Sequence, residues 1–281
     1  MRTKDVEMLM NNTKSENINY KKAILKEYFI KKALFYIYKE SKYWFLTFNW
    51  WTCLRILYDL PRLSEDIDMD ILENKSFDID KFWQEICNYF SKYIGKEISY
   101  SIKSMWRTIL IKIPILRSLW FGDKSSDSDL LYIKFDIQNN DSPYLETQVS
   151  PYMKDWLYFM IKHYNLPTLF SNKIKAIFWR WEKVYKDAYP YKWRDYFDLI
   201  RYLQKNVKPN FKTIQNFLLK DFNIDIKDSK DLIAKLDKKI ESIDPKWIYE
   251  DINWLIEDME FAKSFSQNFK QMYYDLRNNM L

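Results

Sequence analysis

The chain has 281 residues, of which 45 are Lys or Arg and 39 are Asp or Glu, so its formal net charge is +6. With 47% hydrophobic and 30% charged residues, the composition is that of an ordinary globular protein and excludes a disordered chain. The only histidine is His163, which excludes Ser-His-Asp triads, Cys-His pairs and zinc sites with several histidines. Carboxylates, lysines and hydroxyls must therefore carry any catalysis.

Three features of the sequence bear on cellular location. No apolar run approaches the roughly 18 residues of a membrane-spanning helix, and the first residues lack the apolar core of a signal peptide. Cys53 and Cys87 lie far apart without a CxxC motif, which favours a reducing compartment. We therefore expect a cytoplasmic protein with no membrane partner. The basic charge is compatible with a phosphate-bearing partner or with a lysine-rich solvated surface.

The spacing of apolar residues in the first third of the chain predicts helices alternating with short strands. In a helix, apolar residues recur three and four positions apart, whereas in a strand apolar and polar residues alternate with period two. We expect, in chain order, a helix over residues 19–42, a strand over 45–48, a helix over 52–57, a strand over 66–71 and a helix over 78–94.

The later part of the chain changes period twice. Alternating apolar residues predict a meander of strands over residues 97–138, and helical spacing returns beyond about residue 152. We expect helices over 171–184, 192–205, 209–220, 229–242 and 246–279. The fold class is thus α+β, a mixed β-sheet with flanking helices followed by a C-terminal helical domain. The expected domains are residues 1–150 and 151–281, with the breaker Ser150-Pro151 at the boundary.

Acidic residues gather on the predicted strands. Asp66 and Asp68 share one strand face about 6.6 Å apart, and such charges repel unless a cation lies among them. Asp136 lies on the polar face of another predicted strand. Magnesium takes one or two carboxylates together with waters and substrate phosphates, so these three residues are candidate ligands for one or two Mg²⁺ ions. The alternative is a solvated acidic edge strand, and Asp70 is expected to be structural or exposed.

Such a metal site suits one reaction in particular. Two metal ions held by strand carboxylates can activate an attacking oxygen and neutralise departing pyrophosphate during nucleotidyl transfer. That chemistry needs no histidine.

Two segments resemble motifs of one known family. Residues 49–52 read Asn-Trp-Trp-Thr where the family has Gly-Gly-Ser/Thr, and residues 62–68 match its Arg-x-Ser-x-Asp-x-Asp. Residues 173–180 are similar to Lys-x-x-Ala-Leu-x-x-Arg, and residues 193–199 are similar to Gly-Arg-Asp-x-Tyr/Phe-Asp-Leu. Over about residues 40–200, the chain therefore resembles the AbiEii/AbiGii nucleotidyltransferase toxins, distant members of the DNA polymerase β superfamily.

The resemblance implies a function and a set of roles. It implies a metal-dependent nucleotidyltransferase, the toxin of a toxin-antitoxin or abortive-infection system, which transfers a nucleotide from an NTP to a tRNA 3′ end or a protein hydroxyl. A cognate antitoxin is the implied partner. Residues 1–150 would be the nucleotidyltransferase core, and residues 151–281 would complete the nucleotide site. The implied catalytic residues are Asp66, Asp68, Asp136, Lys173 and Asp195, and the implied nucleotide-binding residues are Trp50, Trp51, Thr52, Arg62, Ser64 and Arg194.

Each assignment has a structural alternative. Thr52 could be a helix N-cap, Lys173 a solvated helix lysine, and Arg194 with Asp198 an ion pair one helical turn apart. For the whole chain, the alternative is a catalytically inactive module of the same fold that binds RNA or protein.

The glycine count is unusual. The chain has 2 Gly and 12 Trp, whereas average usage would give about 20 Gly. Trp50, Trp51 and Trp193 stand where the family motifs have glycine, which lets backbone amides approach phosphate without a side chain between them. We hypothesise that most of the tryptophan positions are encoded by UGA, which the organism reads as glycine. UGG codons at 50, 51 and 193 would instead imply an inactive relative.

Overall fold

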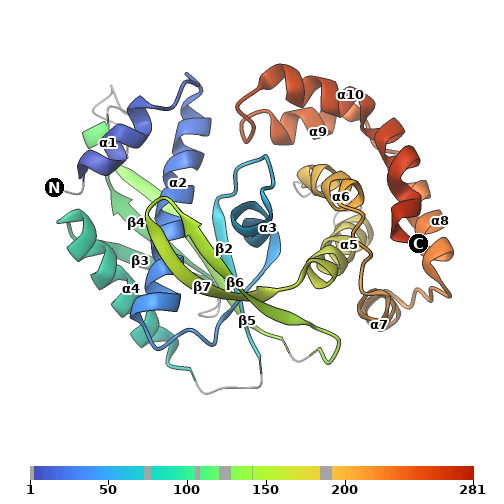
Figure 1. Ribbon diagram of the computed structural model, residues 1–281, viewed down its shortest axis with the longest axis horizontal. Helices are drawn as coiled ribbons and strands as arrows, with labels where there is room; N and C mark the ends of the chain where they lie inside the picture. Colours follow the sequence, from blue (N-terminus) through green and yellow to red (C-terminus); the bar gives the residue numbers. More distant parts are fainter. Residues whose placement is uncertain (1–2, 73–76, 105–107, 120–127, 141, 184–191) are drawn as a thin grey trace. The chain divides into compact units, whose positions relative to one another are not determined.

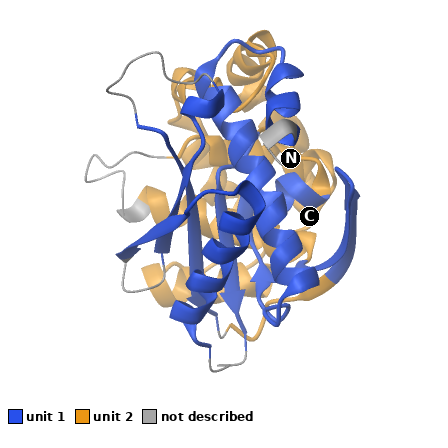
Figure 2. Ribbon diagram, turned by 90° about the vertical axis from the view of Figure 1, so that its left-hand side faces the viewer, with its two compact units in different colours: residues 1–57, 63–141, 149–163 blue, residues 58–62, 142–148, 164–281 orange. Residues whose placement is uncertain are grey.

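The computed structural model describes residues 3–72, 77–104, 108–119, 128–140, 142–183 and 192–281 (Figure 1). The chain divides into two compact units, coloured separately in Figure 2. The sheet unit comprises residues 1–57, 63–141 and 149–163, and the helical unit comprises residues 58–62, 142–148 and 164–281. By this division the sheet unit extends past the boundary expected at residue 150.

Within the described residues, the sheet has seven strands in the order β3-β4-β5-β2-β1-β7-β6. Strand β2 runs parallel to β5, and β1 runs parallel to β7, whereas the pairs β1-β2, β3-β4 and β4-β5 are antiparallel. The predicted mixed sheet is confirmed. The strands are β1 (Thr47–Phe48), β2 (Asp66–Ile71), β3 (Ser99–Ser104), β4 (Thr108–Pro114), β5 (Leu130–Asn139), β6 (Thr147–Lys154) and β7 (Leu157–Tyr164).

Helices of the sheet unit follow the apolar periodicity with small shifts at their ends. Asn17 caps α2 by accepting bonds from the amides of Asn19 and Tyr20, and the expected long helix changes to a π turn after Phe35. Gly95, with φ of +76°, ends α4 in the left-handed conformation that glycine adopts without strain. The elements are α1 (Thr3–Asn11), α2 (Ile18–Phe35), the π turn η1 (Tyr36–Glu40), α3 (Trp50–Tyr58), α4 (Ile79–Ile94) and the 3₁₀ turn η2 (Arg117–Leu119).

The hairpin of β6 and β7 corrects the expectation that helical spacing begins at about residue 152. In β7, the buried residues Leu157, Phe159 and Ile161 alternate with the exposed residues Tyr158 and Met160. This is the period of a strand with one buried face. The signal was present in the sequence, but the apolar residues on both faces obscured the alternation.

The helical unit confirms four of the five helices expected in this part and divides the fifth. The helix expected over 246–279 is two helices, α9 and α10, and the side chain of Asp258 caps the second by accepting a bond from the amide of Phe261. Among the described residues, no helix is both long and apolar enough to cross a bilayer. The elements are α5 (Leu166–Lys183), α6 (Arg194–Gln204), α7 (Phe211–Phe222), α8 (Ser229–Glu241), α9 (Pro245–Ile252), α10 (Met259–Leu276) and the 3₁₀ turn η3 (Arg277–Met280).

Candidate active site

The register of β2 and β5 brings the predicted carboxylates of the sheet unit together. Asp68 lies opposite Asp136 on the parallel neighbouring strand, and Asp66 lies opposite Lys134. Paired strands are about 4.8 Å apart, and alternate residues of one strand point to the same face. Asp66, Asp68 and Asp136 therefore occupy adjacent positions on one face of the sheet.

A lysine lies within this acidic group. Lys134 forms an ion pair with Asp136, whose other carboxylate oxygen accepts a hydrogen bond from the Thr108 hydroxyl on β4. Burial alone would lower the pKa of Lys134, but the bond to Asp136 and the charges of Asp136, Asp66 and Asp68 raise it above its ordinary value. The three carboxylates thus create a negative potential that stabilises a cation at this face.

The fit of a metal ion to this face can be tested on the donor set. In the described part of the chain, no three His, Cys, Asp or Glu side chains have the mutual arrangement of a metal site, and Asp136 is directed to Lys134 and Thr108. The donors themselves are the hard oxygen ligands that Mg²⁺ prefers, and their field already favours a cation. The residue types suit a divalent cation, which would compete with the Lys134 ammonium for Asp136.

Thr52 and Ser64 link the start of α3 to the start of β2. Their hydroxyls are 2.6 Å apart, both residues are buried, and the Thr52 hydroxyl also donates to the backbone carbonyl of Asp66. Thr52 is the third residue of α3, so the alternative that it caps the helix is wrong. These bonds fix the first turn of α3 beside the strand that carries Asp66 and Asp68.

Trp50 begins α3 in a conformation that glycine favours. Its φ is +58°, in the left-handed region that residues with a bulky side chain rarely adopt. The side chain of Asn49 accepts a bond of 2.6 Å from the Trp50 amide, and the Trp50 and Trp51 rings lie 5.2 Å apart. The backbone at residue 50 thus has the geometry expected where the family motif has glycine. Trp193 differs, because its φ of −64° is ordinary helical backbone.

Of the two expectations for Asp70, the structural role is confirmed, because the residue is buried and not exposed. Its carboxylate accepts bonds from the side-chain amides of Asn49 at 3.2 Å, Gln138 at 3.1 Å and Asn140 at 2.7 Å. Asp70 is fully buried and has three hydrogen-bond donors around it. This third acidic residue of β2 therefore links elements of the sheet unit.

A buried ionic cluster lies in the helical unit. Arg62 donates two bonds to Asp198, from Nε at 2.7 Å and from Nη2 at 2.6 Å. The Lys173 ammonium donates to Asp198 at 2.6 Å and to Asp195 at 2.7 Å, and Arg180 also pairs with Asp195. The side chains of Arg62, Lys173, Asp195 and Asp198 are at most 2% exposed. The alternative of a solvated Lys173 is therefore wrong.

The charges of the buried cluster depend on one another. Burial lowers the pKa of Lys173 to about 7, although the charge of Asp198 opposes the change. Burial would raise the pKa of Asp198, but Arg62 and Lys173 hold it below its ordinary value. Asp198 therefore stays ionised and keeps its cations in place.

Arg194 lies outside this cluster. Its Nη1 donates to Asp251 at 3.0 Å, and its backbone amide donates to the other carboxylate oxygen at 2.9 Å. The expected pair of Arg194 with Asp198 is therefore wrong. The two residues do not pair because of the orientation of α6, in which Asp198 is fully buried while Arg194 contacts α9.

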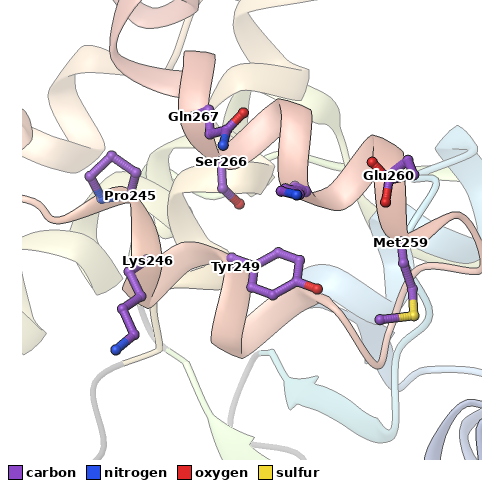
Figure 3. A pocket seen from close by; sticks show the side chains of 8 residues that line it. Pro245, Lys246, Tyr249, Met259, Glu260, Ser266 and Gln267 are labelled. Carbon is purple, nitrogen blue, oxygen red and sulfur yellow. The ribbon is translucent and has the colours of Figure 1, made fainter.

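A surface pocket of the helical unit lies between α9 and α10 (Figure 3). Its volume is about 600 Å³, and its charged lining residues are Lys246, Lys263 and Glu260. Figure 3 shows Tyr249 extending between the two helices. None of the residues predicted from the sequence lines this pocket.

Sequence reasoning missed two partners in the sheet unit, Lys134 and Thr108. Period-two alternation places Lys134 on the same face as Asp136, so that signal was present. No local signal could have identified Thr108, because its contact depends on the antiparallel pairing of β4 with β5.

Comparisons with known proteins identify the family. The family model for the nucleotidyl transferase AbiEii toxin, type IV TA system, matches residues 52–276. The search of solved structures finds a protein of H. pylori, provisionally assigned as a nucleotidyltransferase, with 16% identity and a TM-score of 0.44 over 91% of this chain and 96% of that chain. It also finds JHP933 from Helicobacter pylori, with 15% identity and a TM-score of 0.44 over 91% and 94% of the two chains. No protein with a curated description matches. Because the family model covers more than half of the sequence, this chain belongs to the AbiEii nucleotidyl transferase toxin family of type IV toxin-antitoxin systems.

Proposed function

We propose that this chain is a metal-dependent nucleotidyltransferase that transfers a nucleotide from an NTP to an acceptor, a tRNA 3′ end or a protein hydroxyl. The observation that carries the proposal is the β2-β5 register, which aligns Asp68 with Asp136 on the face that also carries Asp66. Family membership implies an antitoxin as partner. The NTP, the acceptor and the cytoplasmic location belong to the proposal.

The sheet carboxylates have a defined task in this reaction. Asp66, Asp68 and Asp136 would hold Mg²⁺, which when bound offsets the charge of the phosphates and stabilises the departing pyrophosphate. Lys134 would compete with a bound cation for Asp136, because both are attracted to the same carboxylate. An ammonium released from Asp136 would lie on the same face as a charge for phosphate oxygens.

The first turn of α3 supplies the second part of the proposed site. The free amides at a helix N-terminus suit the oxygens of a phosphate group. Thr52 and Ser64 hold this turn beside Asp66, so the predicted phosphate position and the predicted metal position belong to one hydrogen-bonded segment. The Trp50 amide donates to the Asn49 side chain, and glycine at positions 50 and 51 would remove two large side chains from this turn.

The remaining roles implied by the family resemblance stay predictions. Lys173, Asp195 and Arg194 are the predicted nucleotide contacts of the helical unit, and Arg62 and Ser64 are those of the first motif. Arg62 already pairs with Asp198, and Lys173 already pairs with Asp195. A nucleotide contact from any of these residues therefore requires a change of partner.

The test is label transfer from each NTP to total tRNA in the presence of Mg²⁺, with the chain carrying glycine at positions 50, 51 and 193. We expect transfer with one or more NTPs and its loss in Asp66→Asn. Glu65→Gln is the matched control, because it removes a neighbouring carboxylate that pairs with Lys26 at 2.5 Å instead of joining the sheet face. Unchanged tRNA binding without transfer from any NTP would favour the catalytically inactive binding module.

A further inference from the structure

Asp136 is held from β4 by a residue that lies outside the sequence motifs. Thr108 begins β4 and lies directly opposite Asp136 in the antiparallel register. Directly opposed residues of neighbouring strands point to the same face, with Cβ atoms about 4.5–5.5 Å apart. A hydroxyl at this position can therefore reach the carboxylate, and the Thr108 hydroxyl donates a hydrogen bond to Asp136 Oδ1.

The two oxygens of the Asp136 carboxylate have different partners. Oδ1 accepts the bond from Thr108, whereas Oδ2 pairs with the Lys134 ammonium. The Lys134 side chain is 38% exposed, and such a partly exposed ion pair can be exchanged. Thr108 is held more firmly, because its β-branched side chain has few rotamers and β4 pairs with a strand on each side. Oδ2 is therefore the oxygen that can change its partner.

A carboxylate that binds a metal ion must be turned to it. The torsion that rotates the carboxylate of an aspartate has no narrow minimum, so a neighbouring group has to set the plane. Hydrogen bonds from outside the ligand shell do this in metal sites, and their loss typically costs about 10–100-fold in metal affinity or activity. Thr108 is placed to supply such a bond, since Asp136 lies between Thr108 on β4 and Asp68 on β2.

We propose that Thr108 is a positioning residue of the metal site: its hydroxyl fixes the carboxylate of Asp136 and keeps Oδ2 available for a divalent cation. The inference rests on the proposed function, because it takes Asp136 as a metal ligand. A hydrogen bond that only joined β4 to β5 would stabilise the sheet but would leave the affinity for a cation unchanged.

The test is titration calorimetry of Mg²⁺ into the full chain that carries glycine at positions 50, 51 and 193, without NTP or acceptor. Thr108→Val keeps the shape of the side chain and removes its hydroxyl, and we expect the Mg²⁺ affinity to fall at least about tenfold. Thr108→Ser restores the hydroxyl and should bind Mg²⁺ like the parent. In the transfer assay, the Mg²⁺ concentration at half-maximal rate should rise by the same factor in Thr108→Val, with a smaller change in the rate at saturating Mg²⁺.

Thr47→Val is the matched control. Thr47 lies on β1 opposite Asp70, is fully buried, and has a hydroxyl without a hydrogen-bond partner among the described residues. This variant makes the same substitution in the same sheet and should keep the Mg²⁺ affinity of the parent. Equal losses in the two valine variants would show a general effect on the sheet and would overturn the assignment, as would parent-like binding by Thr108→Val.

A second experiment separates Thr108 from Lys134. Lys134→Met removes the ion pair with Asp136 and leaves the bond from Thr108. If the hydroxyl fixes Asp136 itself, Thr108→Val should lower the Mg²⁺ affinity by the same factor in the Lys134→Met background as in the parent. Disappearance of the effect in that background would mean that Thr108 acts only through the lysine, which contradicts the proposal.

The outcomes distinguish this inference from the proposed function. Because the calorimetry contains no NTP or acceptor, absence of transfer together with hydroxyl-dependent Mg²⁺ binding refutes the reaction alone. Transfer that requires Mg²⁺ but is unaffected by Thr108→Val refutes this inference alone. A parent chain that binds no Mg²⁺ would overturn the metal role and this inference together.

A separate observation concerns the turn between β6 and β7. Asp155 and Trp156 have φ of +54° and +59°, and two left-handed central residues define a type I′ hairpin turn, for which Asp-Gly is a preferred sequence. The Trp156 side chain is 91% exposed, so little packing offsets the backbone strain. The other non-glycine residues with positive φ in the described chain, apart from Trp50, are Asp or Asn, which tolerate this conformation.

We infer that residue 156 is glycine in the organism, encoded by UGA as hypothesised for residue 50. This position lies outside the family motifs, so it tests the codon hypothesis independently of them. The gene should carry UGA at codon 156, and the corresponding peptide of the native protein should have the mass of the glycine form. UGG at this codon, or the tryptophan mass, would overturn the inference.

Discussion

The two acidic clusters of this chain differ in burial and in charge balance. On the sheet, three carboxylates act on Lys134, and the side chains of Asp136 and Lys134 are 29% and 38% exposed. In the helical unit, Asp195 and Asp198 are buried among Lys173 and two arginines. Buried charges need permanent partners, whereas partly exposed charges can exchange theirs. The sequence motifs therefore mark both clusters equally, but the sheet cluster is partly exposed, whereas the cluster of the helical unit is buried and paired.

The largest expected effect is on stability in the helical unit. Asp198→Ala leaves Arg62 and Lys173 buried without their shared carboxylate, and we expect the free energy of unfolding to fall by about 3–5 kcal/mol. Urea denaturation measures the change. Asp136→Ala, which alters the partly exposed cluster, should cost no more than about 1 kcal/mol. Similar losses in both variants would remove the distinction between the clusters.

The next effect is on activity in the sheet unit. Asp66→Asn should reduce nucleotide transfer at least about 100-fold, equivalent to about 2.7 kcal/mol of transition-state stabilisation. Its free energy of unfolding should stay within about 1 kcal/mol of the parent, because a neutral amide replaces a charge in a crowded acidic group. Steady-state transfer assays and urea denaturation on the same preparation separate the two outcomes. Retained transfer would contradict a metal role for this residue.

A smaller effect concerns the lysine of the sheet cluster. Lys134→Met removes the cation that competes for Asp136, so we expect divalent-cation affinity to rise about tenfold, or about 1.4 kcal/mol. Titration calorimetry with Mg²⁺ measures it directly. Lys162→Met, which changes a partly exposed lysine on β7 away from this pair, is the control. Weaker binding in Lys134→Met alone would mean that the ammonium supports the site instead of competing for it.

The last prediction uses pH to separate the two lysines. Lys173 has a pKa of about 7 in the folded chain and near 10.5 in the unfolded chain, so the unfolded chain binds more protons between these values. The penalty for burying its charged form is full below pH 7 and is relieved as the pH rises toward 10.5. Lys134, whose pKa is raised, contributes stability that is lost only above its ordinary value.

The measurement is a series of urea denaturations between pH 6 and pH 9.5. Lys173→Met should flatten the rise in the free energy of unfolding with pH, whereas Lys134→Met should leave that rise unchanged. If both variants kept the slope of the parent, the titration of Lys173 would not contribute to it.

Much of the fold could be predicted because periodicity records which face of an element is buried. The strand over residues 66–71 and four helices of the second half lie where the spacing placed them. The β6-β7 hairpin was missed, since Tyr158 and Met160 are apolar yet exposed and blur the alternation of β7. The break between α9 and α10 was missed because the apolar spacing continues across the cap at Asp258.

The candidate site was predictable only in part. The period of a strand places Asp66 and Asp68 on one face, but the residues of a strand do not indicate which other strand it pairs with. The position of Asp136 opposite Asp68 follows from the parallel pairing of β2 with β5 across more than sixty residues of chain. The change of partner at Asp198, from the expected Arg194 to Arg62, likewise follows from packing between distant segments.

The sequence by itself limited the candidate catalytic groups to carboxylates, lysines and hydroxyls, because it has one histidine, and its motifs indicated the family. It also raised the question of the missing glycines. The tertiary structure decided which charges are buried and paired and which are partly exposed. It also located the left-handed backbone at residues 50 and 156. The physical reason is that residue type and period are local properties, whereas burial, strand register and the strain of a turn arise only when distant segments pack.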